Sequence, residues 1–195
     1  MNKYINLLLV IILSSCASFR GRSTNEFSYF PKEILNYNKK VNAKISLKKF
    51  SYTSNGLPVS KSDRLQTKKY VKSVLRKLLG ESKFLKSTKK QKYQVSLDFS
   101  FSKGEAFSSK SRLASWLTLF LYPSRSETTY TATCKFIQNG EVLGEIIKTD
   151  KITTWRQTFM VFAMPFQYPA SEERELIQSL YRSIIIEGFN ENFIL

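Results

Sequence analysis

Histidine is absent from this 195-residue chain, and cysteine occurs only twice. The missing imidazoles exclude Ser-His and Cys-His catalysis, the commonest general base and histidine-containing metal sites. The glycine patterns GxGxxG and GxxxxGK[ST] of nucleotide-binding loops do not occur either. Carboxylates remain, but Glu172, Glu173 and Glu175 are typical of the first turn of a helix. The sequence therefore predicts a protein that is not an enzyme and has no metal site.

The chain also lacks an apolar run long enough to cross a bilayer as a helix, which takes about 20 residues. Its N-terminus has one cation, Lys3, followed by seven wholly apolar residues at 7–13 and two serines before Cys16. A cation, a short apolar core and small residues are typical of a cleaved secretory signal. We therefore expect residues 1–15 to be a signal peptide.

Leu13-Ser14-Ser15-Cys16 closely resembles the lipobox of bacterial lipoproteins. In that family the cysteine thiol is diacylated, the peptide bond before it is cut, and the new amino group is usually acylated. The resemblance implies cleavage between Ser15 and Cys16, with diacylglycerol and an N-acyl chain on Cys16 and no other cofactor. The alternative is an ordinary signal peptide with an incidental cysteine.

The same resemblance implies a location. Two or three acyl chains anchor a protein stably without a spanning helix. Ala17 and Ser18 follow the lipidation site, whereas an aspartate there marks inner-membrane retention in the best-known bacteria. We therefore expect lipid anchoring in the bacterial cell envelope, at the outer membrane. The expected partners are the membrane itself and either another envelope protein or anionic lipid, with no nucleic acid.

Charge is unevenly distributed along the chain. Residues 17–110 contain 22 Lys and Arg against 6 Asp and Glu, whereas residues 111–195 contain 8 against 9. A basic half in an exported protein indicates contact with anionic headgroups or acidic glycans, or simply a solvated lysine-rich surface. If Cys16 carries lipid, Cys134 has no partner for an internal disulfide, and it is typical of a small buried residue.

The chain divides into a polar, interrupted segment and one domain. We expect residues 16–40 to form a lipidated tether with a short ordered piece at 27–35, and residues 41–195 to form a single domain. Alternating apolar residues predict strands at 41–47, 93–101 and 130–136. Helices are predicted at 63–79, with Ser62 as N-cap and Gly80 beyond the last turn, and after Pro169, with Ser171 as N-cap.

Asn139-Gly140 predicts a tight hairpin turn, because both positions of such a turn need positive φ. The register that it sets places Phe136 opposite Leu143 and Ala132 opposite Ile147, unless a bulge near Gly144 shifts it. The element order is thus β-α-β-β-β-α. This order predicts an α+β fold with a mostly antiparallel sheet and two amphipathic helices on one face.

Two apolar segments, residues 113–123 and 159–169, flank this hairpin and should emerge side by side at its open end. Both contain Phe and Tyr, and both close on proline. They fit an interfacial membrane dip or a partner surface; alternatively they cover the second face of the sheet. The candidate contact residues are Trp116, Leu117, Phe120, Tyr122, Trp155, Phe159, Phe162 and Phe166.

A second resemblance covers this region. Four of its segments resemble a pattern in small, mostly uncharacterised envelope lipoproteins: Trp116-Leu-Thr-Leu, the Asn139-Gly140 turn, Thr154-Trp155-x-Gln157 and Met164-Pro165-Phe166. This resemblance implies a location but no reaction.

The predicted helix at 63–79 carries its cations away from its apolar stripe. Its candidate contacts with an anionic surface are Lys69, Lys72, Arg76 and Lys77. We expect a structural or assembly factor of the envelope. The alternatives are a binder or carrier of lipid or acidic glycan, and a surface-exposed adhesin.

Overall fold

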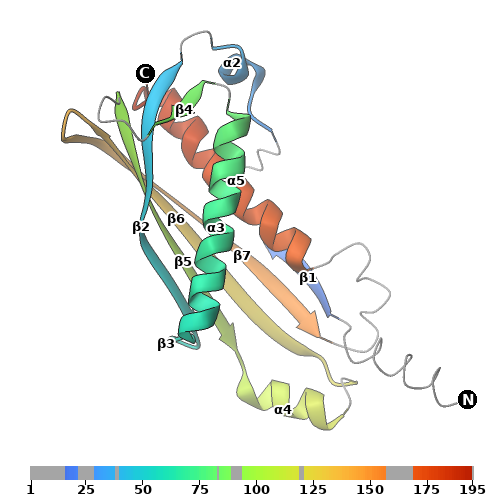
Figure 1. Cartoon of the computed structure of the whole chain (residues 1–195). Helices are drawn as coiled ribbons and strands as arrows, with labels where there is room; N and C mark the ends of the chain where they lie inside the picture. The colour runs from blue at the N-terminus through green and yellow to red at the C-terminus, as the bar shows by residue number, and fades with distance from the viewer. Residues whose placement is uncertain are drawn as a thin grey trace, which may run out of the picture.

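The protein is an α+β domain built on one open, mostly antiparallel sheet (Figure 1). A computed structural model describes residues 16–21, 29–37, 40–82, 84–88, 94–118, 121–156 and 169–194. The strands run in the order β1-β7-β6-β5-β2-β3, and β4 pairs with β2. Their bounds are β1 (Cys16–Gly21), β2 (Val41–Ser54), β3 (Leu57–Pro58), β4 (Leu85–Ser87), β5 (Val95–Phe107), β6 (Ser124–Gln138) and β7 (Glu141–Arg156).

Four helices occur among the described residues: α2 (Lys32–Leu35), α3 (Lys61–Glu81), α4 (Ser109–Leu117) and α5 (Pro169–Asn190). The α+β class and the mostly antiparallel sheet agree with the prediction. The predicted order omitted β1, β3, β4, α2 and α4, and β2 runs parallel to β5 and β4. None of the described helices is long and apolar enough to span a bilayer.

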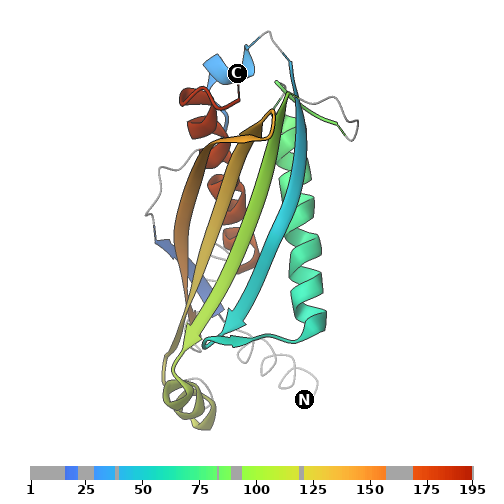
Figure 2. The same cartoon turned by 90° about the vertical axis from the view of Figure 1, so that its left-hand side faces the viewer.

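The long helices α3 and α5 both cover the same face of the sheet, and no described helix lies over the other face, which we call the open face (Figure 2). Helix α3 buries its predicted stripe Val71, Val74, Leu75 and Leu78. Helix α5 buries Leu176, Ile177, Leu180, Tyr181, Ile184 and Ile185 completely. These side chains meet the inward residues of β5, as in the edge-to-face contact of Phe99 with Tyr181, whose ring centroids are 5.3 Å apart. The core therefore lies between one sheet face and two helices.

The helix ends differ from the prediction by one turn or less. Helix α3 begins at Lys61, because the Ser60 hydroxyl, not that of Ser62, accepts a hydrogen bond of 3.2 Å from the Asp63 amide. Gly80 lies within this helix, which continues to Glu81. Helix α5 begins at Pro169 and not after Ser171. Proline suits the first position of a helix, because a backbone N–H at that position has no acceptor within the helix and its absence therefore costs no hydrogen bond.

The hairpin turn is confirmed, with positive φ values of 53° at Asn139 and 89° at Gly140. The predicted pairs of Phe136 with Leu143 and Ala132 with Ile147 are wrong: Phe136 lies opposite Gly144. A bulge between Phe136 and Ile137 shifts the register by one residue. The shift turns Glu145 outward, where it lies opposite Lys135 with an O–N distance of 3.6 Å. Without this bulge, which the sequence indicated as an alternative near Gly144, the carboxylate of Glu145 would face the core.

The N-terminal part of the domain is more ordered than the predicted tether. Residues Cys16–Gly21 form edge strand β1, which is antiparallel to β7. Phe30 and Ile34, in the segment predicted to contain an ordered piece, are buried in the core. The described parts of residues 16–40 are therefore attached to the domain, and Cys16 lies at the edge of the sheet.

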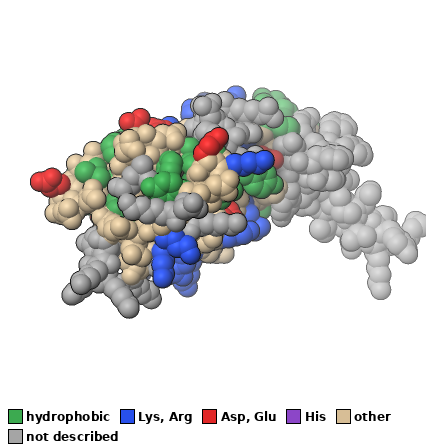
Figure 3. All heavy atoms as spheres, turned by 90° about the horizontal axis from the view of Figure 1, so that it is seen from above, with side chains coloured by type: hydrophobic (Ala, Val, Ile, Leu, Met, Phe, Trp, Pro, Cys, Tyr) green, Lys and Arg blue, Asp and Glu red, His purple; other side chains and the backbone are tan. Residues whose placement is uncertain are grey.

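Seen from above, the end of the molecule with α2 and the C-terminus shows apolar, basic and acidic side chains interspersed (Figure 3). The site described next lies at the opposite end, where α4 projects beyond the sheet (Figure 1).

Candidate membrane-facing end and its pocket

Three chain segments meet at the α4 end of the sheet. The last residue of β7, Arg156, pairs with Ser124 of β6 on one side and with Cys16 of β1 on the other. Antiparallel pairing therefore brings the predicted lipidation site to the same end as the β5–α4–β6 connection. Residues 121–123 lead into β6 at the open end of the hairpin. The companion segment after Arg156 lies outside the described residues until Pro169.

Helix α4 exposes large apolar side chains at this end. Trp116 is 66% exposed and Leu117 is 67% exposed. Leu113, Leu121 and Tyr122 are exposed by 52–60%. Within the described part of residues 113–123, the large apolar side chains are therefore exposed, whereas Ser115 is buried. Adjacent exposed apolar side chains of this size are typical of surfaces that contact a membrane or a protein partner.

Basic side chains accompany this apolar surface, which we call the α4 patch (Leu113, Trp116, Leu117, Leu121 and Tyr122). Lys110 and Arg112 are exposed on the first turns of α4. The Arg112 guanidinium carbon lies 4.2 Å from the centroid of the Phe107 ring. The helix begins where the Ser108 hydroxyl accepts a hydrogen bond of 3.3 Å from the Ser111 amide. Aromatic and aliphatic side chains bordered by cations are typical of interfacial helices.

The other predicted contact residues do not all join this patch. Trp155 is half-buried on the open face of the sheet, where Arg125 lies 5.8 Å from its ring centroid. Tyr122 and Leu117 belong to the α4 patch. Phe120, Phe159, Phe162 and Phe166 lie outside the described residues.

The four predicted cations of α3 lie elsewhere on the molecule. Lys69, Lys72, Arg76 and Lys77 are exposed along α3, away from the stripe that packs on the sheet. None of them is among the described residues that line the pocket at the α4 end. They form a separate solvated surface.

That pocket, which the sequence did not predict, opens between the sheet, α4 and the first turns of α5. Its volume is about 330 Å³. Its walls come from β5, β6, β7, β1 and the end of β2, with Arg112 contributed by α4 and Glu173 by α5. Ser18 and Thr154 line the pocket and hydrogen-bond each other at 2.7 Å. Two pairs further along the same strands, the backbone of Cys16 pairs with Arg156, which also lines the pocket. The predicted lipidation site therefore lies next to the pocket.

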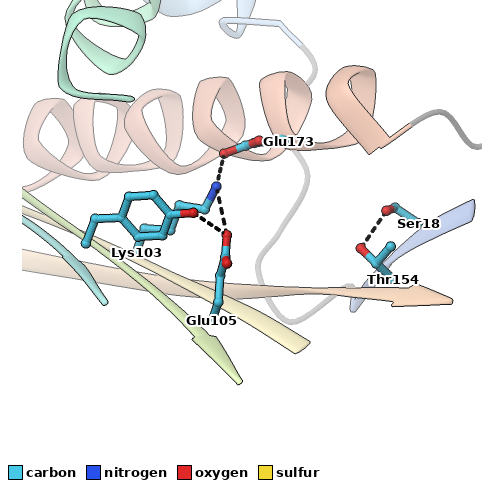
Figure 4. A network of polar contacts seen from close by, with 6 residues as sticks. Ser18, Lys103, Glu105, Thr154 and Glu173 are labelled. Carbon is cyan, nitrogen blue, oxygen red and sulfur yellow. Dashed lines mark hydrogen bonds and ion pairs between the residues drawn. The ribbon is translucent and has the colours of Figure 1, made fainter. Parts of the chain in front are cut away.

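Lys103 lies at the inner wall of this pocket and is 9% exposed. Its Nζ donates to Glu173 Oε1 at 3.0 Å and lies 3.4 Å from Glu105 Oε1 (Figure 4). It also lies 4.8 Å from the centroid of the Tyr52 ring. The Tyr52 hydroxyl donates to Glu105 Oε1 at 2.5 Å. Burial, followed by the bond to Glu105, raises the pKa of Tyr52 well above its usual value. This tyrosine therefore stays neutral and holds the carboxylate in place.

The described lining of the pocket includes three arginines, of which Arg125 forms an ion pair of 3.2 Å with Glu127. No carboxylate among the described residues forms an ion pair with Arg112 or Arg156. Arg112 has an aromatic partner, and Arg156 ends β7 at the rim of the pocket. Two guanidinium groups thus remain able to bind an anion.

The signal for this site was present in the strand pattern. The strand predicted at 93–101 continues to Phe107. Lys103 and Glu105 therefore follow Phe99 and Phe101 on the side of the strand that faces the helices. When charged residues take the buried positions of an alternating strand, they are expected to form ion pairs with other buried charges.

The described residues contain no group of three or more His, Cys, Asp or Glu placed to hold a metal ion. Cys134 is buried in the sheet, and burial raises the pKa of its thiol well above the usual value. A buried, protonated thiol is a poor nucleophile.

Comparison with known proteins gives distant structural similarities. No family model matches the chain, and no curated protein matches it. A Helicobacter pylori protein described as a neuraminyllactose-binding hemagglutinin homolog is 10% identical, with a TM-score of 0.46 over 85% of this chain and 91% of that one. A Xanthomonas campestris protein of the DUF330 family is 9% identical, with a TM-score of 0.41 over 89% and 93%. PelC from Paraburkholderia phytofirmans is 10% identical, with a TM-score of 0.27 over 88% and 96%.

Proposed function

We propose that this protein is a non-catalytic, lipid-anchored envelope protein that lies with its α4 end against a bilayer and acts there as a structural or assembly factor. The observation that carries the proposal is the pairing of Cys16 with Arg156 at the end of the sheet where α4 projects. Acyl chains on Cys16 start directly at this end, because β1 leaves no free tether between the cysteine and the domain.

The α4 patch supplies a second contact in this proposal. An acylated Cys16 brings the exposed Trp116 and Leu117 toward the headgroup region, where tryptophan and leucine are favoured. Lys110 and Arg112 beside the patch add attraction to anionic lipid, by about 1 kcal/mol for each cation near the surface. The domain therefore has a fixed orientation on the membrane, with its open sheet face and its helices exposed at the sides.

The outer membrane is the location that we propose, on the basis of the residues after Cys16. Cell fractionation of a Cys16→Ser variant tests the anchor. We expect the native protein in the membrane fraction and most of the variant in the soluble fraction. High salt should release the remaining membrane-bound part of the variant. Equal membrane association of both proteins would contradict anchoring through Cys16. Mass spectrometry of the native N-terminal peptide provides the control, because an acylated cysteine has a diagnostic mass.

A further inference from the structure

The pocket beside Cys16 has the size and the polarity of a small-ligand site. Its volume of about 330 Å³ is at the lower end of the range of known ligand pockets. Hydroxyl groups form much of its wall, from Ser18, Ser54, Ser124, Ser126, Thr128 and Thr154. Hydroxyls both donate and accept hydrogen bonds, so such a wall suits a ligand that itself carries several hydroxyls.

Charge at the pocket favours an anion. Lys103 is neutralised by Glu105 and Glu173, which lie within 3.4 Å of its Nζ. Arg112 and Arg156 lack an ion-pair partner among the described residues, so the net charge at the rim is positive. Arginine forms paired hydrogen bonds with phosphate and carboxylate oxygens, and its planar group is favoured over lysine for this purpose.

The position of the pocket indicates where the ligand comes from. Arg156 pairs directly with Cys16, and Arg112 belongs to the helix that carries the α4 patch. If this end lies on the bilayer, as proposed above, both arginines reach the depth of lipid phosphates. A ligand that enters from the membrane side therefore has its anionic group at the rim and its hydroxyls in the pocket.

From this arrangement we infer that the pocket binds a phosphorylated polyol: a phosphate held by Arg112 and Arg156, with a hydroxyl-bearing group against the serine and threonine wall. The headgroup of phosphatidylglycerol has this chemistry, and so does a free sugar or glycerol phosphate. The inference depends on the proposed function only for the membrane source of the ligand, not for the chemistry of the pocket.

Binding is tested on residues 16–195 carrying Cys16→Ser, which contain every residue that the structure describes and cannot be acylated at position 16. The probes are dihexanoylphosphatidylglycerol below its critical micelle concentration, glycerol 3-phosphate and, as the zwitterionic control, dihexanoylphosphatidylcholine. Calorimetry or NMR titration measures the dissociation constant. We expect saturable binding of the first probe and at least about tenfold weaker binding of the phosphatidylcholine.

The arginines are tested by Arg112→Gln and Arg156→Gln, each of which removes one charged contact with phosphate. We expect each variant to bind dihexanoylphosphatidylglycerol about tenfold more weakly. The matched control is Lys69→Gln with Arg76→Gln, which removes two cations from α3 and should leave the dissociation constant unchanged. Circular dichroism melting of all variants confirms that they are folded.

The outcomes separate the sources and the two proposals. Binding of both anionic probes supports the phosphorylated polyol in general, and binding of the lipid alone supports a membrane headgroup. Absence of saturable binding to either anionic probe overturns the inference, as does an equal loss of affinity in the α3 control. These binding measurements do not depend on acylation. The inference can therefore fail while anchoring through Cys16 holds, and anchoring can fail while the inference holds.

Discussion

Gly188 of α5 lies directly against the ring of Phe136 on β6: a Cβ at position 188 would be 2.5 Å from Phe136 Cζ. Contacts this short do not occur, so any larger residue at 188 must push the helix or the ring away. We predict that Gly188→Ala lowers the free energy of unfolding by about 1–3 kcal/mol. Urea unfolding measures the change.

Gly80 provides a matched comparison within the other long helix. A Cβ at Gly80 meets nothing within 4 Å. Gly80→Ala should therefore raise the free energy of unfolding by roughly 0.5–1 kcal/mol, because alanine has the better helix propensity. Shifts of equal sign in the two variants would show that α5 does not pack on β6 as described.

Exposure separates the α4 patch from the core. Trp116→Ala should change the free energy of unfolding by less than about 0.5 kcal/mol, as is usual for surface substitutions. Phe99→Ala should lower it by about 3–5 kcal/mol, because Phe99 is fully buried. A large loss of stability in Trp116→Ala would contradict the exposed position of this side chain and the proposed membrane contact.

Tyr181 gives a prediction on pH. Burial raises the pKa of its hydroxyl above the usual 10.0, and the hydroxyl has no hydrogen-bond partner among the described residues. Only the unfolded chain then ionises this tyrosine as pH rises through 10, so stability is full below pH 10 and falls above it.

Tyr181→Phe removes that titrating group and an unpaired buried hydroxyl. The variant should be at least as stable as the native protein at pH 7, and its urea midpoint should fall less between pH 9.5 and 11. A parallel fall in both proteins would exclude Tyr181 as a contributor.

The Lys103 cluster should be sensitive to removal of one charge. Lys103→Gln leaves Glu105 and Glu173 close to each other without the cation between them. We predict a loss of about 1–3 kcal/mol in the free energy of unfolding, since both carboxylates are partly solvated. The triple variant Lys103→Gln, Glu105→Gln, Glu173→Gln should recover part of the loss; a larger loss in the triple variant would argue against charge imbalance as the cause.

Local patterns in the sequence predicted the parts of the fold that depend on neighbours in the chain. The stripe of α3, the alternation of β5 and the Asn139-Gly140 turn are all present. The register predicted for the simple hairpin was wrong, because the strands contain a bulge next to Phe136, which places Glu145 opposite Lys135 on the exposed side.

Long-range contacts explain the remaining differences. Residues 16–21 show no alternation of their own. They form a strand by pairing with the edge of β7, which lies 130 to 140 residues later in the chain. The pocket likewise depends on this pairing, since Ser18 and Arg156 come from opposite ends of the sequence. Lipidation of Cys16 stays a prediction, and the place of this residue at the end of the sheet was not predicted.

The most direct test of the membrane-facing end uses Trp116 as a depth probe. The chain has two tryptophans, so Trp155→Phe leaves Trp116 as the only one. The acylated protein is reconstituted in phosphatidylglycerol-containing vesicles with spin-labelled lipids. We predict a blue shift of the emission and strong quenching by labels at the boundary between headgroups and acyl chains. Unshifted emission without quenching would show that α4 stays in water, and would contradict the proposed orientation.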